Sequence, residues 1–176
     1  MTTDFEALKF PVGKFNSPAT ITPEMISTAI DEIAKLPEQI ENALTGFTEE
    51  QLNTPYRPDG WTIRQVVHHV PDSHMNAYIR FKLALTEENP TIRPYHEDKW
   101  AELSDTANTP IATSLQLLKA LHQRWVVLLK TMKAEDFDRT FFHPEKKNSL
   151  KLAVVVLMYA WHGKHHLGHI LIVKNQ

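Results

Sequence analysis

Hydrophobic side chains recur every three or four residues in three long stretches of the chain, which is the spacing of a buried helix face, and a fourth stretch is apolar nearly all round. The first stretch follows Thr22 and Pro23, where a hydroxyl cap precedes a proline at the first helical position. Pro37 is expected to kink or split this helix, and Gly46 is expected to end its second half. The apolar positions of this stretch are Met25, Ile26, Ala29, Ile30, Ile33 and Leu36.

Two capping-box patterns, each a threonine followed three residues later by a glutamine, mark the next helix starts. Residues 48–51 predict a short helix, and residues 62–65 predict the start of a second long helix. Apolar residues at helical spacing extend this second helix to about Glu87. An interruption is expected at Pro71, because proline cannot donate the helical hydrogen bond.

The second half of the chain predicts two more long helices. Residues 89–108 contain several prolines and polar side chains, so we expect a long irregular connection there. Thr109 and Pro110 repeat the threonine–proline start, and the helical pattern after them runs to about Lys133. A polar stretch follows, and Ser149 is expected to cap a fourth long helix that continues to the end of the sequence.

No stretch shows a convincing strand pattern of alternating polar and apolar residues. With four long helices, this predicts an all-α fold, a four-helix bundle in which residues 1–176 form a single domain. The long connection at residues 89–108 predicts a crossover loop rather than an up-down-up-down bundle with tight turns. The first 20 residues contain Pro11, Gly13 and Pro18 and are expected to form an extended arm.

Charge and composition exclude several classes of function. The 176 residues carry 19 Lys and Arg against 21 Asp and Glu, so the chain lacks the basic surplus of a nucleic-acid binder. The longest apolar run, residues 152–161, is about half of the roughly 20 residues that span a membrane. No apolar stretch near the amino terminus has the form of a secretory signal. We therefore expect a cytoplasmic protein that binds neither nucleic acid nor membranes.

The chain has an unusual set of metal-binding residue types. Cysteine is absent, which excludes disulfides, thiolate ligands and a cysteine nucleophile. Histidine, the commonest metal ligand, occurs 10 times. Seven of these residues form two groups in the sequence: His68, His69 and His74, then His162, His165, His166 and His169.

The second histidine group predicts a pair of inward-facing imidazoles. At about 100° per residue, His162 and His166 lie about 40° apart on a helix, with Lys164 on the opposite side. Since Lys164 is expected to face water, the two histidines should face the bundle interior. His169 shares their side, and His165 lies toward the boundary. Two histidines one turn apart can chelate one metal ion, and a catalytic zinc site commonly adds a third protein ligand.

The third ligand is expected from the helix at residues 62–87. Five polar residues form one stripe on this otherwise apolar helix: Gln65, His69, Ser73, Asn76 and Arg80. His69 belongs to the stripe and is our choice of third ligand. His68 aligns instead with Arg64 and Asp72, as is typical of a surface or rim position.

Two residues of this helix are candidates for catalysis. Asp72 could act as a general base or as an acceptor behind the metal ligands, and Gln65 could contact the substrate. The alternative is that Asp72 is only a surface carboxylate and that Gln65 belongs to a solvated polar face. The histidines have an alternative role as well, since they could simply pack in the core.

Two segments taken together carry a family resemblance: GWTIRQVVHHVPDSHMNAYIRFKLALTE at 60–87 and MYAWHGKHHLGHI at 158–170. They resemble the DinB/YfiT-like family. FPVGKF at 10–15 and PTIRPYHEDKWAEL at 90–103 are similar to its YfiT branch, so the resemblance covers nearly the whole chain. It implies a four-helix bundle, commonly a homodimer, with one divalent metal ion held by three histidines. In this sequence the ligands it implies are His69, His162 and His166.

The resemblance also implies a choice of reactions. Members of the family are described as metal-dependent hydrolases, and relatives as thiol S-transferases that use low-molecular-weight thiols such as bacillithiol. Three neutral imidazoles leave the ion its full charge, which lowers the pKa of bound water toward about 7. We therefore expect a hydrolase that acts on a small-molecule substrate through a metal-bound water. A metal-dependent thiol S-transferase is the alternative, and a non-catalytic bundle that binds a metal or a small molecule is the second alternative.

Zinc is the expected metal, and nickel is the alternative, because an all-imidazole site suits both. No glutamate accompanies the histidine pair in the manner of the H-E-x-x-H proteases, which weakens the case for peptide hydrolysis. Pro71 departs from the family pattern, since a small residue is common at that position. An interior proline costs about 3 kcal/mol unless the helix kinks. We therefore expect either a bent helix or a displaced metal site near His69.

Overall fold

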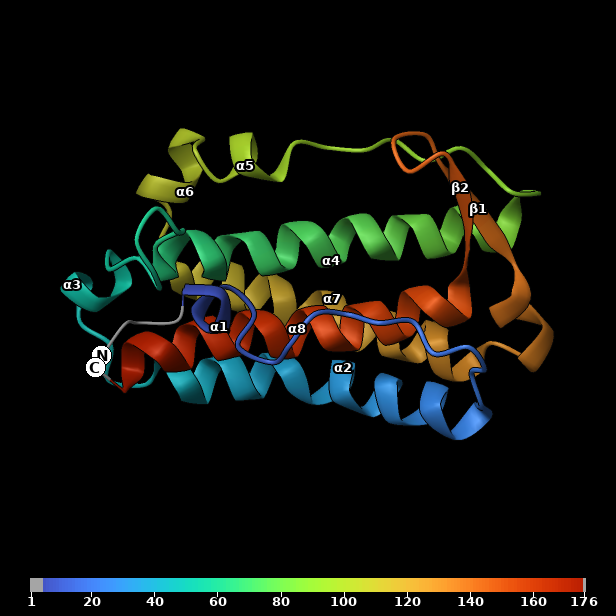
Figure 1. The fold of residues 1–176 in the computed structure, drawn as a ribbon, viewed down its shortest axis with the longest axis horizontal. Helices are drawn as coiled ribbons and strands as arrows, with labels where there is room; N and C mark the ends of the chain where they lie inside the picture. The colour runs from blue at the N-terminus through green and yellow to red at the C-terminus, as the bar shows by residue number, and fades with distance from the viewer. Residues whose placement is uncertain (1–4, 176) are drawn as a thin grey trace.

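Four long helices lie side by side and form the body of the protein (Figure 1). The structure, a computed structural model, describes residues 5–175. Within that range the long helices are α2 (Pro23–Leu44), α4 (Ile63–Thr86), α7 (Ile111–Thr131) and α8 (Leu152–Lys174). The shorter elements are α1 (Phe5–Lys9), α3 (Glu49–Leu52), α5 (Glu97–Trp100), α6 (Ser104–Asn108), the 3-10 helix η1 (Ala134–Asp138), β1 (Thr140–His143) and β2 (Asn148–Lys151). The predicted all-α bundle is confirmed, and the small β1–β2 hairpin is an addition that the sequence pattern did not indicate.

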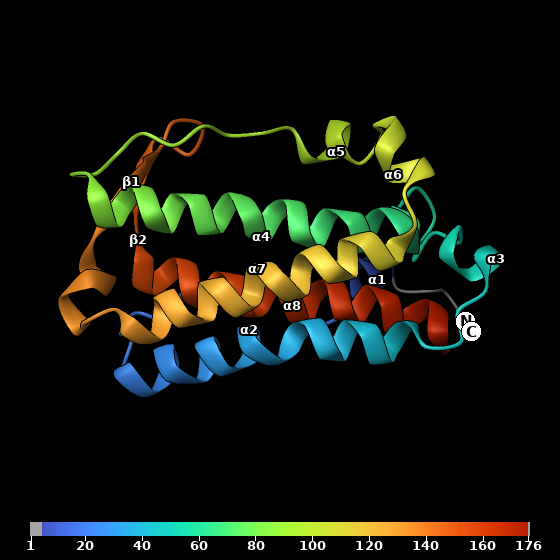
Figure 2. The same ribbon diagram turned by 180° about the vertical axis from the view of Figure 1, so that it is seen from behind.

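The order of the helices around the bundle differs from that of an up-down-up-down bundle. α2 packs against α7 and α8, and α4 packs against the same two helices, so α2 and α4 occupy opposite corners. α4 and α7 run in the same direction, opposite to α2 and α8 (Figures 1 and 2). This parallel pair requires the chain to return along the bundle between its two helices, and residues 87–110 make that return. The predicted crossover is therefore present, although it contains α5 and α6 rather than being wholly irregular.

Hydrogen bonds hold the crossover against the bundle. The side-chain amide of Gln65 donates to the Ala101 carbonyl at 3.0 Å. Nearer the start of the crossover, the Ile92 N–H donates to the Phe142 carbonyl of β1 at 3.0 Å, and the Phe142 N–H donates to the Pro90 carbonyl at 2.9 Å. The crossover is thus fixed to both α4 and the hairpin.

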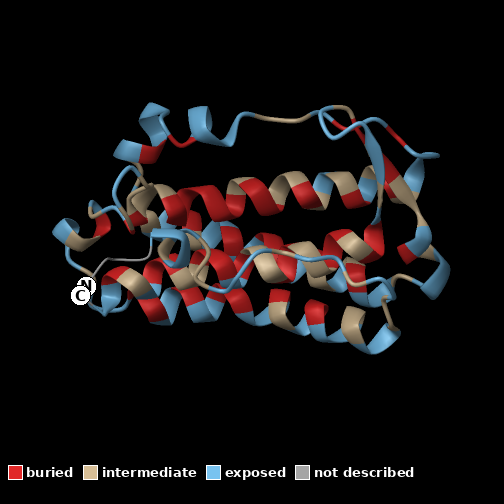
Figure 3. Ribbon diagram, viewed as in Figure 1, coloured by how far each residue is buried: buried red, intermediate tan, exposed pale blue. Residues whose placement is uncertain are grey.

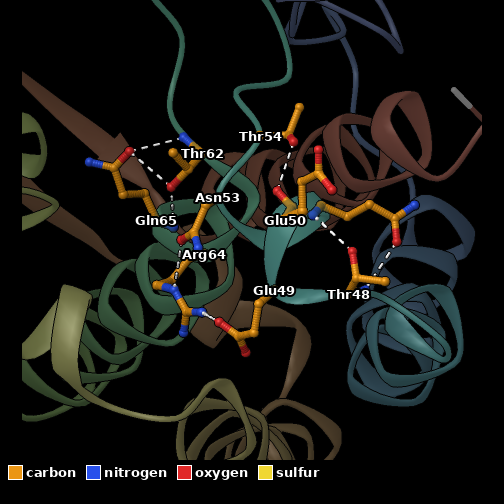
Figure 4. A network of polar contacts seen from close by, with 9 residues as sticks. Thr48, Glu49, Glu50, Asn53, Thr54, Thr62, Arg64 and Gln65 are labelled. Atoms are coloured by element: carbon orange, nitrogen blue, oxygen red, sulfur yellow. Dashed lines mark hydrogen bonds and ion pairs between the residues drawn. The ribbon is translucent and has the colours of Figure 1, made fainter.

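Side-chain caps fix the helix starts at the opposite end of the bundle (Figure 4). Thr48 caps α3 and Thr62 caps α4, and each hydroxyl accepts a hydrogen bond from the backbone N–H three residues later. Both predicted capping boxes are confirmed. Arg64, in the first turn of α4, donates to the Asn53 side chain and pairs with Glu49 of α3. These contacts join the first turn of α4 to α3.

α2 and α4 each continue through a proline. Pro37 lies inside α2 and Pro71 lies inside α4, and both side chains are buried. Neither helix is split, so the expected interruption at Pro71 is wrong; packing against neighbouring helices offsets the lost hydrogen bond. Each proline leaves the carbonyl four residues earlier, that of Ile33 or Val67, without its helical donor. Gly46 follows the end of α2 with φ +82°, as predicted.

Two helix starts differ from the prediction. Ser149 lies in β2 opposite Phe142 of β1, and α8 begins only after β2 ends. The predicted Ser149 cap is therefore wrong, because this segment pairs with the strand that inserts Phe141 into the core. α7 starts after Pro110 and has no side-chain cap, so Thr109 does not take the capping role expected of it.

The amino-terminal arm lies against α8 and is not wholly extended. α1 occupies Phe5–Lys9, inside the first 20 residues for which no helix was expected. After α1, the Trp161 indole N–H donates to the Gly13 carbonyl at 3.0 Å. Pro11 sits so close to α8 that a Cβ at Gly168 would lie 2.7 Å from its Cγ, so a glycine is needed there.

The core consists of two apolar clusters with a layer of histidines between them, and buried residues follow the interior of the whole bundle (Figure 3). The hairpin-end cluster contains Phe81 and Trp125, and the α3-end cluster contains Ile40 and Ile63. Between the two clusters lies the histidine layer, which comprises His69, His74, His122, His162 and His166. Within the described residues, no helix combines the length and hydrophobicity that crossing a membrane requires.

Candidate metal centre

Three histidines converge at one point between α4 and α8. Nε2 of His162 lies 3.3 Å from Nε2 of His69 and 3.2 Å from Nε2 of His166. One nitrogen from each ring lies within 4.8 Å of those from the other two. His162 and His166 stand one turn apart on α8, and His69 faces them from α4. The structure thus brings together the three residues that the sequence suggested as ligands.

Packing holds these rings in place. The ring of Trp61, just before α4, is centred 4.7 Å from that of His69 and stacks at 12° on that of His166, 6.4 Å away. Beside the site, a Cβ at Gly163 would lie 2.5 Å from Leu36 Cδ2. A glycine at this position therefore lets α2 approach α8 closely at the level of the histidines.

Two further histidines lie behind His162 in a row that crosses the bundle. His74 Nε2 is 3.1 Å from His162 Nδ1, and His74 Nδ1 is 2.9 Å from His122 Nε2. His122 Nδ1 donates to the Ile33 carbonyl at 2.7 Å. His74 and His122 are only 0% and 2% exposed. These four residues belong to α8, α4, α7 and α2, so every long helix contributes to the row.

Burial keeps the imidazoles of the layer neutral. It lowers the pKa of His69 and of His122 to about 4. It also lowers the pKa of His74, His162 and His166 well below the usual 6.5. At neutral pH each ring therefore has one N–H and one lone pair, and a lone pair is what a metal ion needs.

The donor set fits a divalent metal ion. Zinc–nitrogen bonds of about 2.0–2.1 Å at tetrahedral angles separate two ligand nitrogens by about 3.3 Å. The two Nε2 pairs at this site are 3.2 and 3.3 Å apart. His162 is half-buried, so the group is accessible from one side. Three imidazoles form this group in the described part of the chain, and three protein ligands with an open position are typical of catalytic zinc sites.

His165, His166 and His169 form a second close group, with one nitrogen of each ring within 4.8 Å of the others. His169 Nε2 donates to the Lys9 carbonyl at 3.3 Å, and its Nδ1 lies 3.4 Å from His166 Nδ1. The His169 ring also stacks on Tyr56 with centroids 3.7 Å apart. Both nitrogens of His169 are therefore engaged with protein groups. His165 is buried too, so the boundary position expected for it is wrong.

A pocket of about 410 Å³ opens onto the three convergent histidines. Its walls come from α4, α8, the crossover and the hairpin. Besides His69, His162 and His166, its polar lining includes Ser73, Arg80, Tyr95, Glu97, His143, Glu145 and Lys146. Cationic donors and carboxylate acceptors are thus present around the same opening.

A larger cavity of about 1100 Å³ lies between the start of α2, the end of α7 and η1. Among the described residues that line it, none is a histidine. The smaller pocket, where imidazole lone pairs and charged groups meet, is therefore the candidate site.

Comparison with known proteins gives the family of the chain. Residues 32–170 match the DinB superfamily. The chain belongs to the DinB superfamily. A Bacillus cereus protein named "Putative metal-dependent hydrolase" is 54% identical over 169 residues, which cover 96% of each chain. A relative of the same description from Bacillus thuringiensis subsp. konkukian is 53% identical with the same coverage.

A solved structure agrees with this DinB assignment. YfiT from Bacillus subtilis, described as a probable metal-dependent hydrolase with an unusual four-helix bundle topology, matches with a TM-score of 0.93. The two proteins are 44% identical, and the match covers 96% of this chain and 97% of YfiT. The predicted DinB/YfiT-like family is thereby confirmed.

In this DinB fold the two candidate catalytic residues do not line the pocket. The Gln65 side chain accepts the Thr62 N–H at 2.9 Å and donates to Ala101, so both of its ends support the fold. Asp72 lies near Asp105 of α6, and burial together with that negative charge raises the pKa of Asp72 to about 6. The structure does not bring Asp72 or Gln65 to the three histidines.

The two histidines of the HH pair face different neighbours. His69 lines the pocket, whereas His68 Nδ1 lies 2.7 Å from Ser114 Oγ of α7. His68 is buried, so the surface position expected for it is wrong, because α7 covers that side of α4.

Several residues around the site were not predicted from the sequence. His122 could have been noticed, since Leu118, His122 and Trp125 share the buried face of α7 at helical spacing. Glu97 and Glu145 reach the pocket from the crossover and from the hairpin. No local pattern signals those two carboxylates, because tertiary structure alone brings their segments together.

Proposed function

We propose that this chain is a metal-dependent hydrolase that holds one divalent ion through His69, His162 and His166. The observation that carries the proposal is the convergence of three neutral imidazoles, with Nε2 atoms 3.2 and 3.3 Å apart, at a pocket. The names of its relatives support the same chemistry. Zinc is the ion we propose, because it suits an imidazole set that leaves a position open.

The three histidines supply neutral lone pairs and no negative charge. When bound there, a divalent ion supplies Lewis acidity that polarises a carbonyl and eases the loss of a proton from water. The proposed substrate is a small molecule, since the pocket of about 410 Å³ lies in the usual range for such ligands.

The other lining residues bind and orient that substrate in our proposal. Arg80 and Lys146 donate hydrogen bonds to its oxygen atoms, and Glu97 and Glu145 offer carboxylate oxygens that can accept a proton. These two glutamates provide the acceptor that the sequence around the histidine pair lacks.

Metal content tests the centre first. Plasma mass spectrometry of untagged protein is expected to find about one divalent ion per chain. His69→Ala, His162→Ala and His166→Ala should each lose the ion while circular dichroism stays helical. His68→Ala is the matched control, because that neighbour faces α7 and should leave the ion in place. Metal-free wild-type protein, or metal retained in the three variants, contradicts the centre.

Turnover then tests the reaction. Protein loaded with zinc is screened against small esters and amides, and against electrophiles supplied with a low-molecular-weight thiol. Hydrolysis that a chelator abolishes and zinc restores supports the proposal. Transfer to the thiol in place of water overturns hydrolysis in favour of an S-transferase.

A further inference from the structure

The row of histidines behind His162 fixes which nitrogen of each ring carries the proton. The Ile33 carbonyl can only accept, so His122 Nδ1 carries a proton in their 2.7 Å contact. His122 Nε2 is then a lone pair, and His74 Nδ1 must donate to it at 2.9 Å. By the same step, His162 Nδ1 donates to His74 Nε2 at 3.1 Å. The lone pair of His162 is therefore left on Nε2, at the candidate metal centre.

These proton positions require neutral rings, and the surroundings of the rings favour neutrality. His74 and His122 are buried, and no ion pair within the described residues involves either ring. A protonated imidazole there would be a buried charge without a counterion.

The carbonyl that starts the row is available because of Pro37. In a regular helix, the Ile33 carbonyl accepts the N–H of the fourth residue after it, and here that residue is a proline without an N–H. α2 continues through Pro37, so the carbonyl stays in the helix without its usual donor. His122 supplies a donor in its place.

A second row starts at the end of α1 and leads to His166. Lys9 is the last residue of α1, so its carbonyl has no partner from a following helical turn. It accepts from His169 Nε2 at 3.3 Å, which leaves the lone pair of His169 on Nδ1. His166 Nδ1 donates to that lone pair at 3.4 Å, so the free lone pair of His166 is on Nε2.

We propose that these two rows are positioning devices, started by the Ile33 carbonyl that Pro37 frees and by the Lys9 carbonyl, and that they aim the Nε2 lone pairs of His162 and His166 at one metal ion. The two lone pairs face each other across 3.2 Å, where they repel unless a cation lies between them. The role of the rows in metal binding rests on the proposed function. The positions of the protons are a property of the metal-free protein and do not depend on that function.

Nitrogen-15 NMR of the imidazole rings in the metal-free full chain tests the rows directly. The expected result is a proton on Nδ1 of His74, His122, His162 and His166, and on Nε2 of His169. A proton on Nε2 of His162 or His166 overturns the proposal whether or not the chain binds metal. Its failure is therefore distinguishable from that of the proposed function.

A pair of substitutions at His122 tests the link to the metal. His122→Leu removes the first donor and is expected to weaken zinc binding about 10-fold to 100-fold, with a mixture of His162 tautomers. His122→Gln can donate to Ile33 and accept from His74, so it should restore most of the affinity and the single tautomer. Unchanged affinity and tautomer in His122→Leu overturn the first row.

Substitution of the helix prolines tests whether Pro37 makes the Ile33 carbonyl available to His122. Pro37→Ala returns an N–H that competes with His122 for Ile33, so zinc affinity is expected to fall up to about 10-fold. Pro71→Ala is the matched control, because the carbonyl it concerns, that of Val67, is not part of either row. An equal loss in both variants, or no loss in Pro37→Ala, overturns the role of Pro37.

Discussion

The histidine layer and the hairpin-end cluster are both buried, but different interactions hold them. Phe81 and Trp125 are fully buried, and their rings pack edge to face at 5.6 Å. Apolar side chains of similar volume could replace them at modest cost. A ring in the layer, such as His122, depends instead on one particular atom at each nitrogen. The apolar cluster therefore stabilises the bundle. The histidine layer lowers the free energy of unfolding, because polar rings are buried, but it fixes a specific arrangement of polar atoms.

Low pH is expected to give the largest difference between the contributions of the histidine layer and the hairpin-end cluster to stability. Burial lowers the pKa of His122 to about 4, whereas an unfolded histidine titrates near 6.5. The unfolded state therefore takes up the proton first, and the stability that this ring contributes is lost as the pH falls from about 6.5 to about 4. His122 and His69, whose pKa values are both lowered to about 4, each account for about 2 kcal/mol by pH 5. The pKa values of His74, His162 and His166 are lowered as well, so they add to the loss.

Denaturant unfolding of the metal-free protein at about pH 7.5 and about pH 5 measures this loss. His122→Leu should show a shallower pH dependence than wild-type protein, because one titrating ring is gone. Equal stability of wild-type protein at the two pH values would contradict the assignment of neutral rings to the layer.

A cavity in the hairpin-end cluster is expected to have the next largest effect. Phe81→Ala removes a fully buried ring and should lower the free energy of unfolding by about 4 kcal/mol. Its pH dependence and its metal content should match those of wild-type protein, because the ring belongs to the apolar cluster. Urea unfolding measures the free energy of unfolding and its pH dependence, and plasma mass spectrometry measures the metal content. Loss of metal from a folded Phe81→Ala variant would show that the two regions are not separable.

The smallest effect is expected at Asp72, which belongs to neither region. Burial and the charge of Asp105 raise the pKa of Asp72 from 3.8 to about 6, so the folded state favours the protonated acid. This group therefore adds stability as the pH falls from about 6 to 3.8, which is opposite in sign to the histidines. Asp72→Asn should raise the free energy of unfolding at about pH 7.5 by about 1 kcal/mol, after a discount for its partly exposed side chain.

Thermal or denaturant unfolding at about pH 7.5 and about pH 4 checks this prediction, and the two proteins should converge at the lower value. Asp98→Asn, at an exposed position on α5, is the matched control. A destabilising Asp72→Asn at the higher pH would mean that the carboxylate has a favourable partner.

The sequence predicted the bundle because three of the long helices have apolar residues at helical spacing and the fourth, α8, is apolar on nearly all sides. Thr62 caps α4 as expected, since a capping box depends only on neighbouring residues. The hairpin was missed because its strands are four residues each, too short for a periodicity. The interruption expected at Pro71 is absent because helix packing, which no local pattern reveals, holds α4 together.

Helical spacing predicts which site residues of one helix face the same way, and it predicts nothing about residues of different helices. His162 and His166 are one turn apart on a single helix, so their common direction follows from the sequence. His122 joins them only through the packing of α7, and Glu97 only through the course of the crossover. Residues brought together across the bundle are the part of the site that the sequence could not supply.

The row from Ile33 to His162 takes one member from each of the four long helices. No pair of helices can assemble it alone, and the parallel α4–α7 pair adds contacts between distant parts of the chain. Such contacts form late in folding, because loop closure must precede them. A refolding chain should therefore reach its full affinity for the ion only at the last assembly step. In the native protein, opening of α2 or α7 would break the row without removing a ligand, so local opening of either helix should lower the affinity for the ion.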